Sequence, residues 1–117
     1  MTIGVVGSRR RAAGVDLMLV RAAVARIYRP GDAFVSGGCP TGADKFAEII
    51  AAELQAPIKV HPAEWATRGR SAGFYRNTFI AQDADVLIAC VAPDRTGGTE
   101  DTIKKYQKLG KIQLVLC

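Results

Sequence analysis

The chain has 117 residues, of which 49% are hydrophobic and 23% charged, and its formal net charge is +5. This length and composition are typical of one globular domain, residues 1–117, and they exclude a membrane-spanning chain because no apolar run approaches the roughly 20 residues required. The first apolar run is also too short for a signal peptide, so we expect a cytoplasmic protein. The positive net charge favours an anionic partner.

Apolar runs and helical periodicities alternate along the chain. Short apolar runs predict five strands, and the i, i+3, i+4 spacing of apolar residues between them predicts four helices. The expected strands are Thr2–Val6, Ala33–Val35, Pro57–Val60, Asp85–Val91 and Ile112–Leu116, and the expected helices are Val15–Tyr28, Thr41–Leu54, Ser71–Gln82 and Thr99–Leu109. Residues 61–70 are expected to be irregular, and Ser71 is expected to cap the helix that follows.

Two of these helices carry apolar stripes that we expect to be buried. The stripe of the first helix consists of Val15, Met18, Leu19, Ala22, Ala23 and Ile27. The stripe of the second consists of Phe46, Ala47, Ile50, Ala51 and Leu54.

The alternation of strands and helices predicts a Rossmann-like three-layer α/β sandwich with a five-stranded parallel sheet. Because crossovers are right-handed, few topologies remain, and the leading strand order is 3-2-1-4-5. Ligands bind such sheets at the carboxyl ends of the strands, where the winding direction switches. In this order the switch point lies between the first and fourth strands.

Glycine-rich turns follow the first, second and fourth strands. They are Gly7-Ser8-Arg9, Ser36-Gly37-Gly38 and Thr96-Gly97-Gly98-Thr99. A strand that ends in glycines and leads into a helix presents backbone N–H groups beside a positive helix end. We therefore predict a pocket for a phosphorylated ligand, with the first and third turns flanking the switch point.

Side chains in the first turn suit an anion. Ser8 offers a hydroxyl, and the guanidinium of Arg9 can donate two parallel hydrogen bonds to a phosphate. The alternative is a tight turn with a solvated arginine. The dinucleotide pattern G-x-G-x-x-G and the P-loop lysine are both absent.

The second and third turns each lead into a helix that begins with an acid. Thr41 follows the second turn and is expected to cap its helix beside Gly42, while Asp44 is either a first-turn acid or a contact to a ribose hydroxyl. Thr99 is expected to cap the last helix. Glu100 is either another first-turn acid or an acid–base group.

Further candidates come from the middle of the chain. Trp65 either stacks on a base or packs on the core. His61 has no partner visible in the sequence and is weak support for catalysis. Arg76 stands beside Asn77 near the start of a helix, where it reaches a phosphate or simply faces solvent.

The cysteines Cys39, Cys90 and Cys117 are scattered and never stand in C-x-x-C spacing. This argues against a disulfide framework or a zinc site and for a reducing compartment, and we expect no metal and no resident cofactor. Cys90 lies in an apolar run and is expected in the core. Cys39 lies in a glycine turn, where a reactive thiol is the alternative to a structural one.

Taken together, these stretches resemble the SLOG superfamily, which groups the DNA-processing A (Smf) proteins with the Lonely Guy phosphoribohydrolases, and in particular its small YspA-like branch. The matching stretches are Gly7-Ser8-Arg9, Ser36-Gly37-Gly38 through Gly42-Ala43-Asp44, Pro62-Ala63-Glu64-Trp65, Ala72-Gly73 with Arg76-Asn77, and Gly98-Thr99. The resemblance implies a Rossmann-like fold whose pocket binds nucleotides or nucleotide-derived ligands. Lonely Guy enzymes carry the motif Pro-Gly-Gly-x-Gly-Thr-x-x-Glu, but here the glutamate position holds Thr102.

Our leading hypothesis is a domain that binds a nucleotide or nucleotide-derived ligand, with Glu100 and Arg76 as the catalytic pair if it also hydrolyses a phosphoribosyl or N-glycosidic bond. The alternatives are a single-stranded DNA-binding module of the DNA-processing A type and a sensor that binds a nucleotide without turning it over. A homodimer or larger homo-oligomer follows only by analogy with related folds. The predicted ligand contacts are Gly7, Ser8, Arg9, Ser36, Gly37, Gly38, Thr41, Gly42, Asp44, Trp65, Arg76, Asn77, Gly97, Gly98 and Thr99.

Overall fold

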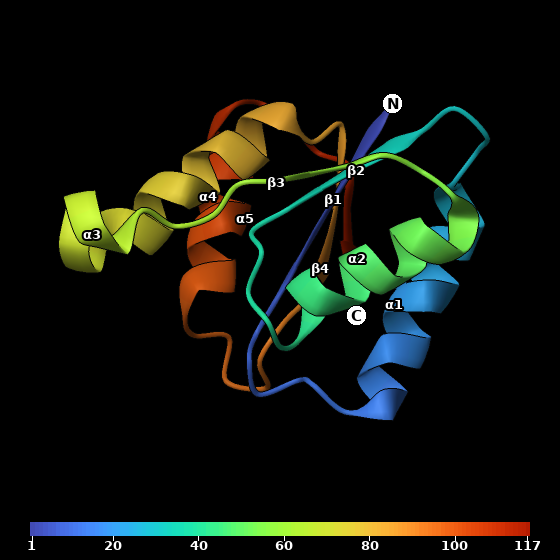
Figure 1. Ribbon diagram of the computed structural model, residues 1–117, viewed down its shortest axis with the longest axis horizontal. Helices are drawn as coiled ribbons and strands as arrows, with labels where there is room; N and C mark the ends of the chain where they lie inside the picture. Colours follow the sequence, from blue (N-terminus) through green and yellow to red (C-terminus); the bar gives the residue numbers. More distant parts are fainter.

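The computed structural model describes the backbone of residues 1–117 and every side chain except that of Arg70. Within these residues, five parallel strands form one sheet in the order β3-β2-β1-β4-β5 (Figure 1). The elements in chain order are β1 (Thr2–Gly7), α1 (Gly14–Ile27), β2 (Ala33–Ser36), α2 (Ala43–Leu54), β3 (Ile58–Val60), α3 (Trp65–Arg68), the 3-10 turn η1 (Gly69–Ser71), α4 (Ala72–Asp83), β4 (Val86–Cys90), α5 (Gly98–Lys108) and β5 (Leu114–Leu116). The predicted fold class and strand order are confirmed.

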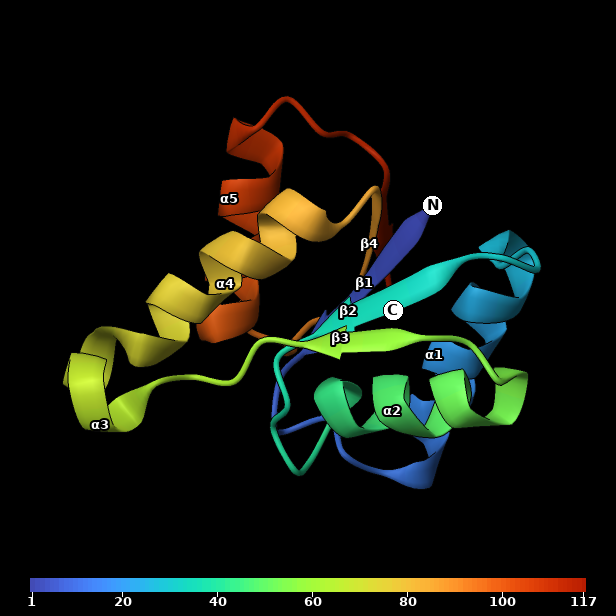
Figure 2. The same ribbon diagram turned by 45° about the horizontal axis from the view of Figure 1, so that its top comes forward.

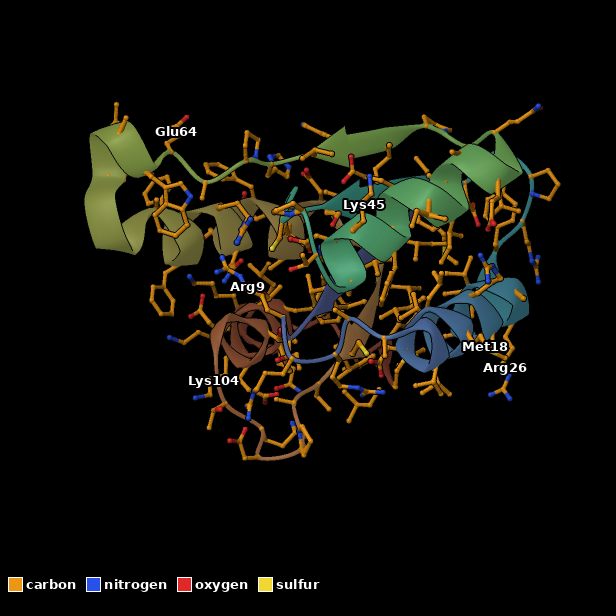
Figure 3. The ribbon with its side chains drawn as sticks, turned by 60° about the horizontal axis from the view of Figure 1, so that its bottom comes forward. Arg9, Met18, Arg26, Lys45, Glu64 and Lys104 are labelled. Carbon is orange, nitrogen blue, oxygen red and sulfur yellow. The ribbon has the colours of Figure 1, made fainter. Side chains whose placement is uncertain are left out.

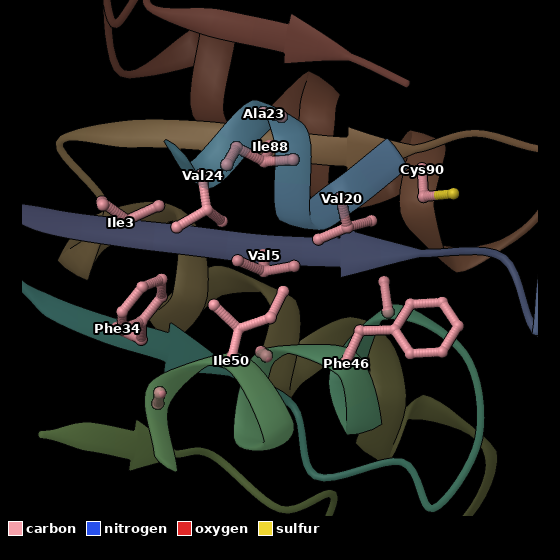
Figure 4. Packing of buried hydrophobic residues seen from close by; sticks show 13 residues of the cluster. Ile3, Val5, Val20, Ala23, Val24, Phe34, Phe46, Ile50, Ile88 and Cys90 are labelled. Atoms are coloured by element: carbon pink, nitrogen blue, oxygen red, sulfur yellow. The ribbon is translucent and has the colours of Figure 1, made fainter. Parts of the chain in front are cut away.

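Helices cover both faces of the sheet, and each face has its own core. α1 and α2 lie on one face, and α4 and α5 lie on the other (Figure 2). The strands are buried on both sides, so successive β1 residues contribute to different cores: Val5 packs with α1 and α2, and Val6 packs with α4 and α5. Figure 4 shows the first core, in which Val5 of β1 belongs to the same buried cluster as Val20 of α1 and Ile50 of α2. Strands that are buried on both faces explain the continuous apolar runs in the sequence.

The buried face of α1 differs from the prediction. Val20 and Val24, which the predicted stripe did not include, are buried, and so is Ala23, which it did include, whereas the predicted Val15 and Met18 are 62% and 65% exposed. Apolar residues occur on both sides of this helix, so the 3.6-residue period fits two faces equally well. Packing against β1 and β4 decides which face of α1 is buried, and periodicity alone could not predict this.

The predicted stripe of α2 is confirmed over most of its length. Phe46, Ala47, Ile50 and Ala51 are buried, while Leu54 in the last turn is 39% exposed. Helical periodicity succeeds here because the outward face of α2 is mostly polar.

Part of the segment expected to be irregular is helical. α3 forms a single turn, in which the Arg68 N–H donates to the Glu64 carbonyl at 2.9 Å. Ser71 precedes α4 as predicted, but its hydroxyl donates to the Arg68 carbonyl at 2.8 Å and makes no capping bond to α4. One turn is too short to produce a detectable apolar period.

Two side chains fasten the C-terminal part of the chain, one beside the sheet and one at the end of α4. The buried hydroxyl of Tyr106 in α5 lies 2.8 Å from the Asp85 carbonyl and 2.9 Å from the Gln113 carbonyl. The ammonium of Lys111 donates to three carbonyls at the end of α4, at 2.7 to 2.9 Å. The last carbonyls of a helix have no partner within it, so Lys111 satisfies groups that α4 leaves open.

No helix among the described residues is long and apolar enough to cross a membrane.

Candidate ligand-binding site

A cavity of about 570 Å³ lies where β1 and β4 end. The chain leaves these neighbouring strands toward opposite faces of the sheet, so the cavity occupies the predicted switch point. Its walls come from the turn after β1, the start of α2, the α3–α4 segment and the loop into α5. The lining residues are Val6, Gly7, Ser8, Arg9, Arg10, Cys39, Asp44, Trp65, Gly73, Phe74, Arg76, Asn77, Ile80, Asp94, Thr96, Gly97, Gly98, Thr99 and Thr102.

Gly7 allows three elements to meet at the base of the cavity. A Cβ added here would lie 2.6 Å from the Ala43 Cβ and 2.9 Å from the Cys90 Cβ. The next amide, on Ser8, donates to the Cys90 carbonyl at 2.9 Å, so it is already paired rather than free for a phosphate. The Ser8 hydroxyl accepts a hydrogen bond from the Arg10 N–H at 3.2 Å.

Arginines approach the cavity from two sides. Arg9 is exposed and extends into the space between α2, α4 and α5 (Figure 3). Arg76 enters from α4, where its Nη1 donates to the Gly37 carbonyl at 2.7 Å and its Nε donates to the Asn77 Oδ1 at 3.0 Å. Two existing hydrogen bonds therefore orient Arg76, whereas Arg9 faces solvent.

The second glycine turn supports the cavity from behind. Asp44 is 9% exposed and accepts hydrogen bonds from the Ser36 hydroxyl and the Cys39 N–H, each at 3.0 Å. A Cβ at Gly37 would lie 2.3 Å from the Arg76 Nη1, so a larger residue here would require the guanidinium of Arg76 to move from its present position. Cys39 and Asp44 line the cavity. The remaining predicted contacts from this turn lie outside the lining of the described cavity: Ser36, Gly37, Gly38, Thr41 and Gly42.

Neither threonine that was expected to cap a helix does so. The residue before α2 is Gly42 with φ +75°, and Thr41 is exposed one position earlier. The residue before α5 is Gly97 with φ +101°, and Thr99 lies inside the helix with 6% exposure. These backbone conformations strongly favour glycine, which explains why a threonine does not hold the capping position.

An ion pair joins the two loops that flank the switch point. The guanidinium of Arg10 contacts both carboxylate oxygens of Asp94, and its Nη2 donates to the Thr96 hydroxyl at 3.1 Å. That hydroxyl donates to the Asp94 Oδ1 at 2.7 Å. The hydrogen bond from Arg10 lowers the pKa of Asp94 to about 2, so Asp94 is charged at neutral pH. Neither Arg10 nor Asp94 was among the ligand contacts predicted from the sequence, where the run Arg9-Arg10-Arg11 was the one available signal.

The predicted catalytic pair is divided between two environments. Arg95 donates to both oxygens of Glu100 at 2.8 and 2.9 Å, and Glu100 lies outside the lining of the described cavity. Arg76 lines the cavity. Thr102 lines it too, and its hydroxyl donates to the Gly98 carbonyl at 3.3 Å. The carboxylates along the cavity are instead Asp44 and Asp94.

Two aromatic side chains from the α3–α4 segment also line the cavity. Trp65 and Phe74 line the cavity and are 55% and 54% exposed. Asn77 fixes this segment to α5, because its Nδ2 donates to the Gly98 carbonyl and to the Asp101 Oδ2, each at 3.2 Å. Trp65 therefore does not pack into the core, which was one of its two predicted roles.

His61 lies outside the lining of the described cavity and has a structural partner. Its Nε2 lies 2.6 Å from the Asp83 Oδ2, and its ring stacks on Phe79 with centroids 5.5 Å apart. The sequence could not reveal this partner, because Asp83 follows 22 residues later. Among the described side chains, no group of three or more His, Cys, Asp or Glu residues could hold a metal ion.

Comparison with known proteins establishes the fold. No protein-family model and no curated protein matches the chain. Among solved structures, the molybdenum cofactor binding protein from the phototrophic bacterium Rippkaea orientalis is similar, with a TM-score of 0.73 and 22% identity. The similarity covers 98% of this chain and 74% of that chain. It shows that the two chains share the α/β architecture.

Proposed function

We propose that this chain is a single domain that binds a small phosphorylated ligand of the nucleotide type in the cavity at the ends of β1 and β4. One observation carries the proposal: the cavity lining combines basic and hydroxyl side chains from the turn after β1 and the loop into α5 with two half-exposed aromatic rings and Arg76 from the α3–α4 segment. A phosphate and a planar ring on one molecule would match both kinds of side chain.

The polar part of the lining suits a phosphate. Arg9 and Arg10 come from the first turn, and α5 begins at Gly98 with its N-terminal end against the cavity. The first N–H groups of a helix lack partners within it, and the helix dipole favours an anion at this end. An arginine fork adds paired hydrogen bonds to phosphate oxygens.

The aromatic part of the lining suits a planar ring. Trp65 and Phe74 expose about half of their surfaces, so a base could cover apolar area that now faces water. Stacking of this kind accepts different rings, because every base has a π-face. The volume of about 570 Å³ is that of an ordinary small-molecule pocket.

Two similarities to known proteins favour a small molecule rather than a polymer as the ligand. The structural neighbour is named as a cofactor-binding protein, and the resemblance to the SLOG superfamily favours a nucleotide-derived ligand. Hydrolysis is left out of the proposal, because Arg95 holds Glu100 outside the cavity lining. We expect the ligand to be recovered unchanged.

Calorimetric titration with AMP, adenosine and ribose 5-phosphate tests the proposal. AMP should bind more tightly than either part, and the fluorescence of Trp65, the only tryptophan in the sequence, should change. Arg9→Gln should weaken AMP binding about tenfold, since hydrogen bonds to charged groups contribute roughly 1.5–3 kcal/mol. The matched control is Arg26→Gln, which removes the same charge from the exposed side of α1 (Figure 3). Absence of AMP binding at millimolar concentration would refute the proposal.

A further inference from the structure

The Arg10–Asp94 pair lies along the cavity where the proposed phosphate would bind. Both residues and Thr96 belong to the lining, and the two side chains remain 55% and 56% exposed. The Arg10 N–H is tied to the Ser8 hydroxyl, so the base of this side chain is fixed beside the first turn.

The groups around Asp94 are donors that also suit a phosphate. Two guanidinium N–H groups of Arg10 and the hydroxyl of Thr96 all donate to this one carboxylate. A guanidinium fork binds carboxylates and phosphates through the same paired geometry. Asp94 thus occupies an anion position made by Arg10 and Thr96.

We propose that Asp94 is a built-in competitor at this position, and that ligand binding exchanges its carboxylate for a phosphate on Arg10. This inference rests on the proposed function and identifies the ligand group as a phosphate dianion. A ligand with a single negative charge would only replace one monoanion by another. A dianion interacts more strongly with Arg10, and the displaced Asp94 is readily solvated because the ion pair is exposed.

The exchange makes Asp94 a specificity-determining residue. Asp94 stays ionised at neutral pH, since Arg10 lowers its pKa to about 2, so every ligand must displace a charged group. Removing that charge should therefore tighten phosphate binding, but only while Arg10 is present to receive the phosphate.

A double-mutant cycle tests the exchange. AMP affinity is measured by calorimetry for the wild type, Asp94→Asn, Arg10→Gln and the double variant. We expect Asp94→Asn to tighten binding roughly fivefold when Arg10 is present and less than about twofold when it is combined with Arg10→Gln, a coupling within the usual range for contacting residues. Glu53→Gln is the matched control, because it removes the same charge from the exposed Arg21–Glu53 pair outside the cavity lining and should leave affinity unchanged.

The outcomes separate this inference from the proposed function. Equal tightening with and without Arg10 would show a general charge effect and overturn the exchange, and so would weaker binding by a folded Asp94→Asn variant. If Asp94→Asn fails to fold, Asp94→Ser replaces it in the same cycle. If the wild type binds no AMP, the proposed function fails and the exchange fails with it. If the wild type binds but the cycle shows no coupling, the exchange alone fails.

Discussion

Replacing Gly7 by alanine should destabilise the fold at the base of the cavity. The new Cβ would lie 2.6 Å from the Ala43 Cβ and 2.9 Å from the Cys90 Cβ, whereas carbon atoms in favourable contact are about 3.5–4.0 Å apart. No rotamer change relieves this overlap, because both neighbouring atoms are bonded directly to the backbone. To restore an ordinary carbon–carbon contact distance, α2 or β4 would have to move by about 1 Å.

Before any compensation, the expected loss of unfolding free energy is near the upper end of the range for an overpacked core. Overpacking typically costs about 1–3 kcal/mol, and the lower chain entropy of alanine in the unfolded state returns about 0.4–1 kcal/mol. We therefore expect Gly7→Ala to lower the free energy of unfolding by about 2 kcal/mol, or the Tm by roughly 8 °C for a chain of this size. Urea denaturation followed by circular dichroism measures the change.

Gly14→Ala is the matched control for this substitution. Gly14 is the first residue of α1, and no described atom lies within 4 Å of a Cβ placed there. Alanine favours the helix and restricts the unfolded chain, so this variant should be neutral or up to about 1 kcal/mol more stable. Equal urea midpoints for the two variants would refute the steric argument.

Three further predictions concern hydrogen bonds and charge. Tyr106→Phe should cost about 1–2 kcal/mol in urea denaturation because the hydrogen bond of its hydroxyl to the Asp85 or Gln113 carbonyl is lost, whereas Tyr75→Phe at an exposed position should stay within about 0.5 kcal/mol of wild type. Lys111→Met should lower the Tm and reduce the free energy of unfolding by about 1–3 kcal/mol, because the last carbonyls of α4 lose their hydrogen-bond donor. Lys108→Met, at an exposed position, should not. The Asp94 carboxyl has a lowered folded-state pKa, so it stabilises the fold above the ordinary aspartate value of about 3.9 and that contribution disappears as the pH falls toward 2. A carbon NMR titration should place its midpoint near 2, and a midpoint near 4 would contradict the ion pair.

Much of the fold could be predicted because burial on both faces leaves a direct mark on the sequence. β4 is buried at every position from Val86 to Cys90, and only a continuous apolar run satisfies both of its faces. The glycine turns were visible for a related reason, since Gly7 stands where a side chain would collide with two neighbouring elements. These features depend on one residue and its local environment.

Other features depend on residues that are distant in the sequence and could not be predicted. The two faces of α1 are both apolar, so only packing against the sheet decides that Val20 is buried and Met18 exposed. Arg10 and Asp94 are 84 residues apart, and no local pattern relates them. Positive-φ glycines occupy the capping positions before α2 and α5. Threonine is also a favoured capping residue, so residue type alone could not distinguish each glycine from the threonine near it.

The central position of β1 has a consequence for synthesis of the chain. β1 is synthesised before the other four strands, yet it lies between β2 and β4, and β4 follows only from residue 86. The cavity needs both residues 7–10 and residues 94–99, which are synthesised much later, so a nascent chain that stops before α5 lacks part of the lining. A ligand at a hundred times its Kd would favour the completed fold over unfolded forms by about 2.7 kcal/mol. Ligand binding would thus favour molecules that contain both segments over truncated ones.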